Sequence, residues 1–260
     1  MPSCAQQKSA AGALPARAAE LGVRVTWSIV ARDPSSSAFG VAVTTKFFAV
    51  GALCPHAASG IGGVATQALI NPHYGPLGLK LLAEGRPAAE VVRTLVEGDL
   101  GAGIRQVHVV DAQGNVAAHT GTGCIDWCGH RPGTGFSVAG NMLVGQAVID
   151  RTFEAYEAGS AQPFARRLLD ALDAGQEAGG DKRGKQSAAL LIHSGEDYPE
   201  YSLRVDDHQE PLVELRRLLD VYEADYAMFR AILPSRAHPS GIFDRAKIEE
   251  VRARRAPTRP

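Results

Sequence analysis

The order in which strand-like and helix-like segments follow one another constrains the fold of this 260-residue chain more than any single motif. Short runs rich in β-branched and aromatic residues predict strands, and longer runs with leucines at helical spacing predict helices. The strands come in groups that are separated by pairs of helices. A doubly wound parallel sheet needs a helix after each strand, so this order excludes it. We therefore expect an α+β fold in which two antiparallel sheets stack together under helices on both outer faces.

The predicted elements follow from the spacing of apolar residues and from the turn-forming residues between them. The predicted strands are residues 26–32, 39–45, 61–69, 105–111, 115–120, 136–139, 186–193 and 201–205. The predicted helices are a segment that follows Pro72 and ends at Gly85, and residues 88–97, 142–158, 163–175 and 211–229. A glycine-rich loop that holds two cysteines and a histidine is expected over residues 121–135.

The sequence predicts one domain between two segments of different composition. Residues 1–25 are rich in alanine and small polar residues and lack the apolar stretch of a secretory signal, which predicts a disordered extension or a translation start assigned too early. Residues 26–233 contain all the predicted elements and are expected to form the domain. Residues 234–260 form a polar, basic C-terminal tail.

Charge balance and missing motifs argue against several classes of function. Lysine and arginine total 27 and aspartate and glutamate total 28, so the basic surplus typical of nucleic-acid-binding proteins is missing. No run approaches the roughly 18–20 continuous apolar residues of a membrane span. Neither GxGxxG nor GxxxxGK[ST] occurs, and we expect no nucleotide cofactor. Four cysteines are too few for a disulfide scaffold at this length, and we expect a cytoplasmic protein.

Many stretches of the sequence resemble one bacterial family. They are TWSIVARDP at residues 26–34, GVAV at 40–43, KFFAVG at 46–51, ATQA at 65–68, NP at 71–72, YG at 74–75, GL at 78–79, GH at 129–130, GN at 140–141, GGDKRG at 179–184, QSAA at 186–189 and LRVDDH at 203–208. From about Thr26 to Leu219, the chain resembles the domain-of-unknown-function 1028 (DUF1028) family. This resemblance implies a branch of the N-terminal-nucleophile (Ntn) hydrolases, whose fold is a four-layer α-β-β-α sandwich.

The resemblance implies a catalytic role for Thr26, which opens the first predicted strand. In Ntn hydrolases, a Thr, Ser or Cys at this position attacks an amide carbonyl, and its own α-amino group is the base. An α-amine with a pKa of about 7.7–8.0 is well suited to accept a proton at neutral pH. The alternative is that Thr26 is only a β-forming residue of a strand.

The 25 residues before Thr26 depart from this pattern, because while they remain attached its nitrogen is an amide and cannot act as a base. We expect either that the segment is removed or that translation starts later. A valine codon at Val25 can start translation, and removal of the initiator methionine would then leave Thr26 as the first residue.

Four further residues match catalytic roles that the resemblance implies. Asn141, at a predicted junction of strand and helix, either contributes to an oxyanion hole or caps a helix that begins at Met142. Asp181 and Ser187 resemble residues that polarise the threonine and its amine, although Asp181 also fits an ordinary loop aspartate. Lys46 either lowers the pKa of the nucleophile by its charge or is simply solvated.

Five residues are candidates for contact with a substrate: Thr66, Gln67, His119, Trp127 and His130. The sequence also contains Cys124, Cys128 and His130 in one loop, which raises the alternative of a zinc site. The C-x3-C spacing is not the usual C-x2-C, and a second pair of ligands is missing nearby, so we expect no metal.

The sequence and the resemblance together predict an amide hydrolase that acts on a small amide, a peptide or a cyclic amide through a threonyl ester. A non-catalytic member that keeps the fold for binding is the first alternative, and a metal-dependent hydrolase built on the cysteine loop is the second. The resemblance is also compatible with a homo-oligomer.

Overall fold

The computed structural model describes residues 26–253 and contains two antiparallel sheets. The six-stranded sheet has the order β10 (Tyr201–Val205), β9 (Ser187–His193), β2 (Phe39–Thr45), β1 (Thr26–Arg32), β8 (Phe136–Leu143) and β7 (Trp127–Pro132). The four-stranded sheet has the order β3 (Pro55–Ala58), β4 (Gly62–Ala68), β5 (Arg105–Asp111) and β6 (Val116–Thr120). Every pair of neighbouring strands is antiparallel.

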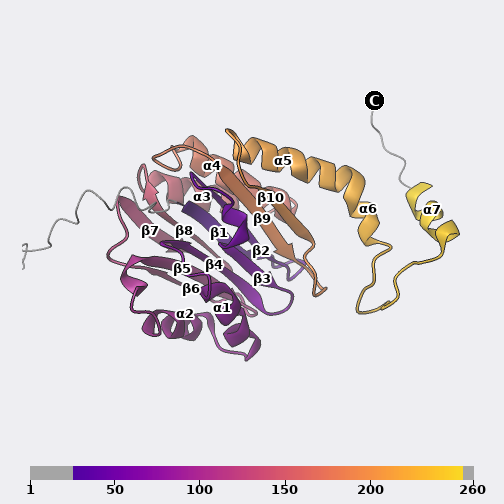
Figure 1. The fold of residues 1–260 in the computed structure, drawn as a ribbon, viewed down its shortest axis with the longest axis horizontal. Helices are drawn as coiled ribbons and strands as arrows, with labels where there is room; N and C mark the ends of the chain where they lie inside the picture. Colours follow the sequence, from indigo (N-terminus) through magenta and orange to yellow (C-terminus); the bar gives the residue numbers. More distant parts are fainter. Residues whose placement is uncertain (1–25, 254–260) are drawn as a thin grey trace, which may run out of the picture.

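Helices cover the outer face of each sheet, as Figure 1 shows. The four-stranded sheet is covered by α1 (Tyr74–Ala83) and α2 (Ala88–Glu97), and the six-stranded sheet by α3 (Ala147–Ala158), α4 (Phe164–Glu177) and α5 (Pro211–Val221). Buried apolar side chains form one cluster under each helical layer and a third between the sheets. The expected α+β fold with two stacked antiparallel sheets is confirmed.

The central strand β1 is buried on both faces, and its side chains alternate between two environments. Trp27 and Ile29 pack in the cluster under the helices, whereas Val30 packs in the cluster between the sheets. Ser28 and Thr26 share the inter-sheet face with Val30, because side chains two residues apart point to the same side of a strand. Two polar side chains are therefore held inside the sandwich.

Most of the predicted boundaries are correct to within two residues, but the segment between β6 and α3 differs. The expected loop over residues 121–135 contains β7, an edge strand whose composition of Trp, Cys, Gly, His, Arg and Pro gives no apolar alternation. Strand β8 continues to Leu143, and α3 begins only at Ala147 instead of at residue 142. Asn141 therefore lies inside a strand, and the expected junction of strand and helix at this residue is wrong.

Three smaller differences lie elsewhere in the chain. The short strand β3 is not predicted from the sequence, because it has only four residues and begins with a proline. The expected helix over residues 211–229 is interrupted by a π-helical turn, Tyr222–Tyr226, before α6 (Ala227–Arg230). The C-terminal tail contains α7 (Arg245–Ala253), which Figure 1 shows away from the sheets.

Among the described residues, none of the helices has both the length and the apolar composition needed to cross a membrane.

Asp111, at the end of β5, fastens α2 to the β5–β6 turn. Its carboxylate is buried and accepts four hydrogen bonds, from the backbone N–H groups of Ala88 (3.1 Å), Gln113 (3.0 Å) and Asn115 (2.9 Å) and from the Asn115 side chain (3.0 Å). Ala88 is the first residue of α2, where a negative charge also interacts favourably with the helix dipole.

We expect Asp111→Ala to lower the free energy of unfolding by about 3 kcal/mol, because buried N–H donors that lose their acceptor keep their desolvation cost. Urea unfolding followed by circular dichroism measures this change. The control is Asp244→Ala at the start of α7, where an exposed carboxylate accepts a hydrogen bond from Ala246 N–H, and a loss of about 1 kcal/mol or less is expected. Equal losses for the two variants would contradict the role of Asp111.

Candidate active site

Thr26 is the first residue of β1 and lies between two neighbouring strands. It pairs with Asn141 of β8, and its hydroxyl donates a hydrogen bond to the Thr45 hydroxyl at the end of β2 (3.3 Å). Only 3% of Thr26 is exposed. The first of the predicted catalytic residues is thus held by contacts to both adjacent strands.

Asp181 lies at the same end of β1. It forms a bridge with Leu143 at the end of β8, and its Oδ2 accepts a hydrogen bond from the backbone N–H of Lys46 just after β2 (2.7 Å). These two strands are the neighbours of β1, so Asp181 connects them at the level where Thr26 begins. The side chain is fully buried, and it also accepts hydrogen bonds from the backbone N–H (2.8 Å) and guanidinium (3.3 Å) of Arg183.

Two side-chain amides hold Thr26 from the inside of the sandwich, and a third amide holds these two in place. Gln67 of β4 and Asn141 of β8 each direct an N–H group to the Thr26 carbonyl oxygen, both at 3.4 Å. Both amides also donate to Gln106 Oε1, at 2.7 Å and 3.0 Å. The Gln106 amide nitrogen is in turn directed to the carbonyl oxygens of Gly129 (3.0 Å) and Gly140 (2.9 Å). This network joins the two sheets behind Thr26.

His108 and Ser28 extend the network along the inter-sheet face. The Ser28 hydroxyl donates its single hydrogen to Gln67 Oε1 (2.5 Å) and lies 2.8 Å from His108 Nε2. His108 Nε2 must therefore carry the hydrogen in the second contact, which requires the Nε2–H tautomer. Burial, and to a lesser extent the charge of His130, lower the pKa of His108 to about 3, so the ring is neutral.

Ser187 supports the segment that follows β2. Its hydroxyl donates to the Phe47 carbonyl oxygen (2.5 Å) and accepts from the Val50 N–H (3.1 Å). The serine is completely buried at the start of β9. The Ser187 hydroxyl is thus engaged with the backbone of the turn between Phe47 and Val50.

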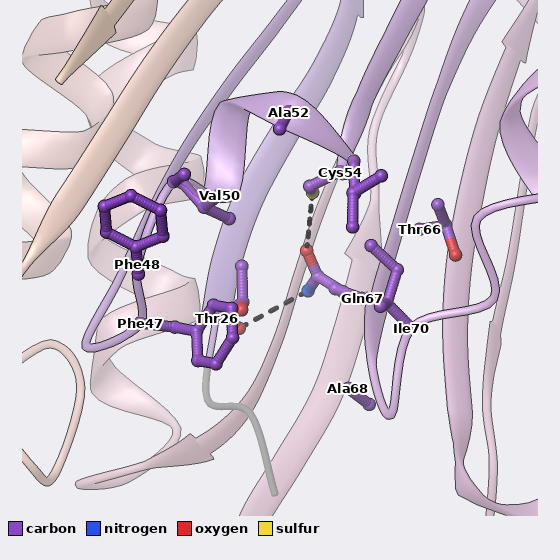
Figure 2. A pocket seen from close by; sticks show the side chains of 12 residues that line it. Thr26, Phe47, Phe48, Val50, Ala52, Cys54, Thr66, Gln67, Ala68 and Ile70 are labelled. Atoms are coloured by element: carbon purple, nitrogen blue, oxygen red, sulfur yellow. Dashed lines mark hydrogen bonds between the residues drawn. The ribbon is translucent and has the colours of Figure 1, made fainter. Parts of the chain in front are cut away.

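A cavity of about 350 Å³ opens beside Thr26, as Figure 2 shows. One wall is formed by residues of the segment from Phe47 to Cys54, and the other by residues from Thr66 to Ile70. Thr26 and Gln67 contribute polar atoms, and most of the remaining lining is apolar. The predicted contacts Thr66 and Gln67 therefore do line a pocket next to Thr26.

Three alanine or methionine residues near this pocket have a left-handed backbone, which side-chain-bearing residues adopt rarely. They are Ala49 (φ 53°), Ala68 (φ 66°) and Met142 (φ 50°). Ala49 and Ala68 line the cavity, and Met142 follows Asn141. Such backbone strain persists only when the surrounding structure imposes it, and it is concentrated at functional sites.

The remaining predicted residues lie away from this cavity. The Lys46 side chain is exposed and donates to the Lys185 carbonyl oxygen (3.2 Å) in a neighbouring open groove. None of the three other predicted contacts lines the cavity: His119 lies on β6, and Trp127 and His130 lie on β7. Strand β6 is at the opposite edge of its sheet from β3, and β7 is at the opposite edge of its sheet from β10. His119 binds the Ala102 carbonyl oxygen (2.9 Å), and Trp127 packs against the core under the helices.

The cysteine loop does not assemble a metal site in the described part of the chain. Within residues 26–253, no group of three or more His, Cys, Asp or Glu side chains could hold a metal ion. Cys124 donates to the Arg105 carbonyl oxygen (3.5 Å), while His130 Nδ1 lies 2.9 Å from the Thr120 hydroxyl. Burial raises the pKa of Cys124 to about 11, with a further contribution from Cys128, which opposes the thiolate form that binds metals.

Three residues of the inter-sheet network, Ser28, Gln106 and His108, are not among the candidates predicted from the sequence. Gln106 and His108 alternate with valines in β5, a pattern that usually marks a strand with one face in solvent. In the structure, that polar face points into the inter-sheet space. Polar residues at period two in an otherwise apolar strand are the signal that could have identified them.

Comparison with known proteins identifies the family. The family of unknown function DUF1028 matches residues 26–215, so the chain belongs to this family. The crystal structure of protein SPO2555 from Silicibacter pomeroyi, a DUF1028 protein, is 32% identical, with a TM-score of 0.79 over 85% of this chain and 96% of that chain. Anbu (ancestral beta-subunit) from Yersinia bercovieri is 14% identical, with a TM-score of 0.36 over 80% of this chain and 98% of that chain. The search of curated proteins gave no match.

The buried His108 predicts a loss of stability in acid. Its pKa is lowered from 6.5 to about 3 in the folded protein, so below pH 6.5 the unfolded chain takes up a proton that the folded protein does not. This contribution falls as the pH drops from about 6.5 toward 3, by up to about 1.4 kcal/mol per pH unit. Urea unfolding at pH 7, 6 and 5 should show a shallower decline for His108→Gln. The exposed His73→Gln control should keep the slope of the unmodified protein.

The left-handed Ala49 predicts that glycine is preferred at this position. We expect Ala49→Gly to raise the free energy of unfolding by about 1 kcal/mol, because glycine removes the clash of Cβ with the backbone. The control is Ala52→Gly in the same segment, at the end of a short 3-10 helix, where glycine should lower stability by about 0.5 kcal/mol. Thermal and urea unfolding measure both, and a loss of stability in Ala49→Gly would refute the strain.

Proposed function

We propose that this protein is an amide hydrolase of the Ntn type, with Thr26 as its nucleophile. The observation that supports the proposal most strongly is the combination at one end of β1. There the Thr26 hydroxyl borders an apolar cavity, and the buried carboxylate of Asp181 lies at the level where the strand begins. A nucleophile, a group to orient its amine and a pocket for the substrate are the parts that this chemistry needs.

In the proposed reaction, the Thr26 Oγ1 attacks the carbonyl carbon of the amide while the free α-amine of Thr26 accepts the hydroxyl proton. The C–N bond then breaks, and the leaving amine takes up that proton. The acyl group remains on Thr26 as an ester. Water attacks this ester with the same α-amine as base, the acid leaves, and Oγ1 recovers its proton.

The other site residues have positioning roles in this proposal. Gln67 and Asn141 hold the Thr26 carbonyl oxygen and thereby fix the direction of its hydroxyl and amine. Asp181, which is held by the Lys46 N–H, orients the amine of Thr26 by its negative charge. Ser187 holds the wall of the pocket through Phe47 and Val50.

The mechanism requires a free amino group on Thr26, whereas Val25 precedes it in the 260-residue sequence. An amide nitrogen is not basic at neutral pH and cannot accept the hydroxyl proton. A chain that keeps residues 1–25 would therefore bind a substrate without cleaving it by this route. Binding without catalysis is therefore the second candidate function. Intact-mass measurement of the purified protein separates the two, because catalysis requires a chain that begins at Thr26.

Activity can be tested by placing a protease recognition site directly before Thr26 in the full chain and cutting the purified protein. We expect the cut protein to hydrolyse fluorogenic amino-acyl amides and the uncut protein to be inactive. Thr26→Ala should reduce turnover by on the order of 10³-fold or more, as loss of a covalent nucleophile does in other hydrolases. Thr26→Ser, which keeps a hydroxyl and an α-amine, is the matched control and should retain measurable turnover.

Equal activity before and after cutting would refute the role of the α-amine. Undiminished activity in Thr26→Ala would refute the nucleophile. Circular dichroism spectra of the variants verify that a loss of activity does not reflect a loss of the fold.

A further inference from the structure

The cavity beside Thr26 contains almost no group that could accommodate a charge. Phe47, Val50 and Ile70 are among its lining residues, and none of the lining residues is Asp, Glu, Lys or Arg. Placing a charged group against such a surface costs free energy unless a partner or water compensates it. The lining therefore favours an uncharged, apolar group.

The polar atoms of the cavity are already engaged with one another. The Gln67 amide oxygen accepts a hydrogen bond from Ser28 and lies 3.9 Å from the Cys54 sulfur, and its nitrogen faces the Thr26 carbonyl oxygen. Burial raises the pKa of Cys54, so its thiol stays neutral at physiological pH. None of these groups offers a charge to a bound molecule.

The cavity is large enough for one large side chain. A volume of about 350 Å³ corresponds to roughly a dozen water-sized units at about 30 Å³ each, which is enough for a leucine or phenylalanine side chain and the adjoining amide. Phe48 and Leu53 also line the cavity, and they are 60% and 41% exposed. Large apolar side chains exposed around a hollow are typical of binding sites.

Lys46, the basic residue next to the cavity wall in the sequence, is directed elsewhere. It precedes Phe47 in the chain, but its ammonium group binds the Lys185 carbonyl oxygen (3.2 Å) in the neighbouring groove. That groove also contains Asp207 and Glu210, so it is of mixed charge. A substrate in the apolar cavity would therefore not need a carboxylate to match Lys46.

From this geometry we infer that the cavity selects amides with an uncharged apolar side chain, of the size of leucine or phenylalanine, next to the scissile bond. The inference rests on the proposed function, since it assigns the substrate class of the same site. The side chain next to the scissile bond determines specificity, and acidic and basic side chains are excluded.

Binding is measured without turnover, on the full chain that carries Thr26→Ala, both before and after residues 1–25 are cut off. The probes are the N-acetyl methylamides of leucine, phenylalanine, alanine, lysine and glutamate, titrated by ligand-observed NMR. We expect the leucine and phenylalanine amides to bind at least tenfold more tightly than the lysine and glutamate amides, and more tightly than the alanine amide. Equal affinities, or no binding of the leucine and phenylalanine amides in either form, would overturn the inference.

A matched pair of variants tests the location of binding. Ile70→Asp places a charge in the lining and should weaken binding of the leucine amide at least tenfold. Leu69→Asp, one residue earlier and outside the lining, is the control and should change it less than twofold. Ala52→Leu, at an exposed position of the lining, narrows the cavity without disturbing the core and should weaken the phenylalanine amide more than the alanine amide. Unchanged binding in both lining variants would overturn the assignment.

Hydrolysis of the same amide series by the cut protein with Thr26 intact separates this inference from the proposed function. Selective binding without hydrolysis would refute the catalytic proposal and leave the pocket assignment supported. Hydrolysis that depends on Thr26 but shows no preference among the five side chains would refute the pocket assignment alone.

Discussion

The hydrogen bonds that the amides of Gln67, Gln106 and Asn141 make with one another determine how the rest of the site is arranged. They join the two sheets at the point where Thr26 begins β1. Because these amides lie in the apolar interior, each unmade hydrogen bond would cost about 1–3 kcal/mol, and the network therefore has little freedom to rearrange. The position of the Thr26 carbonyl is fixed by the same contacts that hold the sandwich together.

The site is assembled from segments that are far apart in the sequence. Thr26 comes from the first strand, Asn141 and Asp181 lie more than one hundred residues later, and the pocket wall comes from the turns after β2 and β4. The Ser187 hydroxyl, on the strand next to β2, fixes the turn between Phe47 and Val50 that forms one wall of the pocket. The left-handed backbone at this turn is held by such contacts against its intrinsic cost.

Much of the fold could be predicted from the sequence. The bounds of β1, β2, β5, β10 and α2 agree with the predicted ones, because each is a run of clear periodicity with turn residues at its ends. The β7 strand could not be found in this way, because the hydrogen bonds of β8 impose an extended conformation on residues whose own pattern indicates a loop. The predicted residues Thr66 and Gln67 line the pocket, and the predicted Asp181 lies between the ends of β8 and β2. Gln106 and His108, in contrast, follow a pattern typical of a solvent-facing strand until the second sheet covers them.

The sequence by itself determined the α+β order of elements, the family resemblance and the strand that begins with Thr26, because all of these depend on local patterns along the chain. Only the tertiary structure decided which polar side chains become buried and where the Asp181 carboxylate lies relative to Thr26. It also decided that the residues beside Thr26 enclose an apolar cavity. These properties arise when two sheets stack and distant strand ends meet. The physical reason is that burial and hydrogen bonding depend on which surfaces come into contact, and a periodic pattern in one strand does not specify its partner.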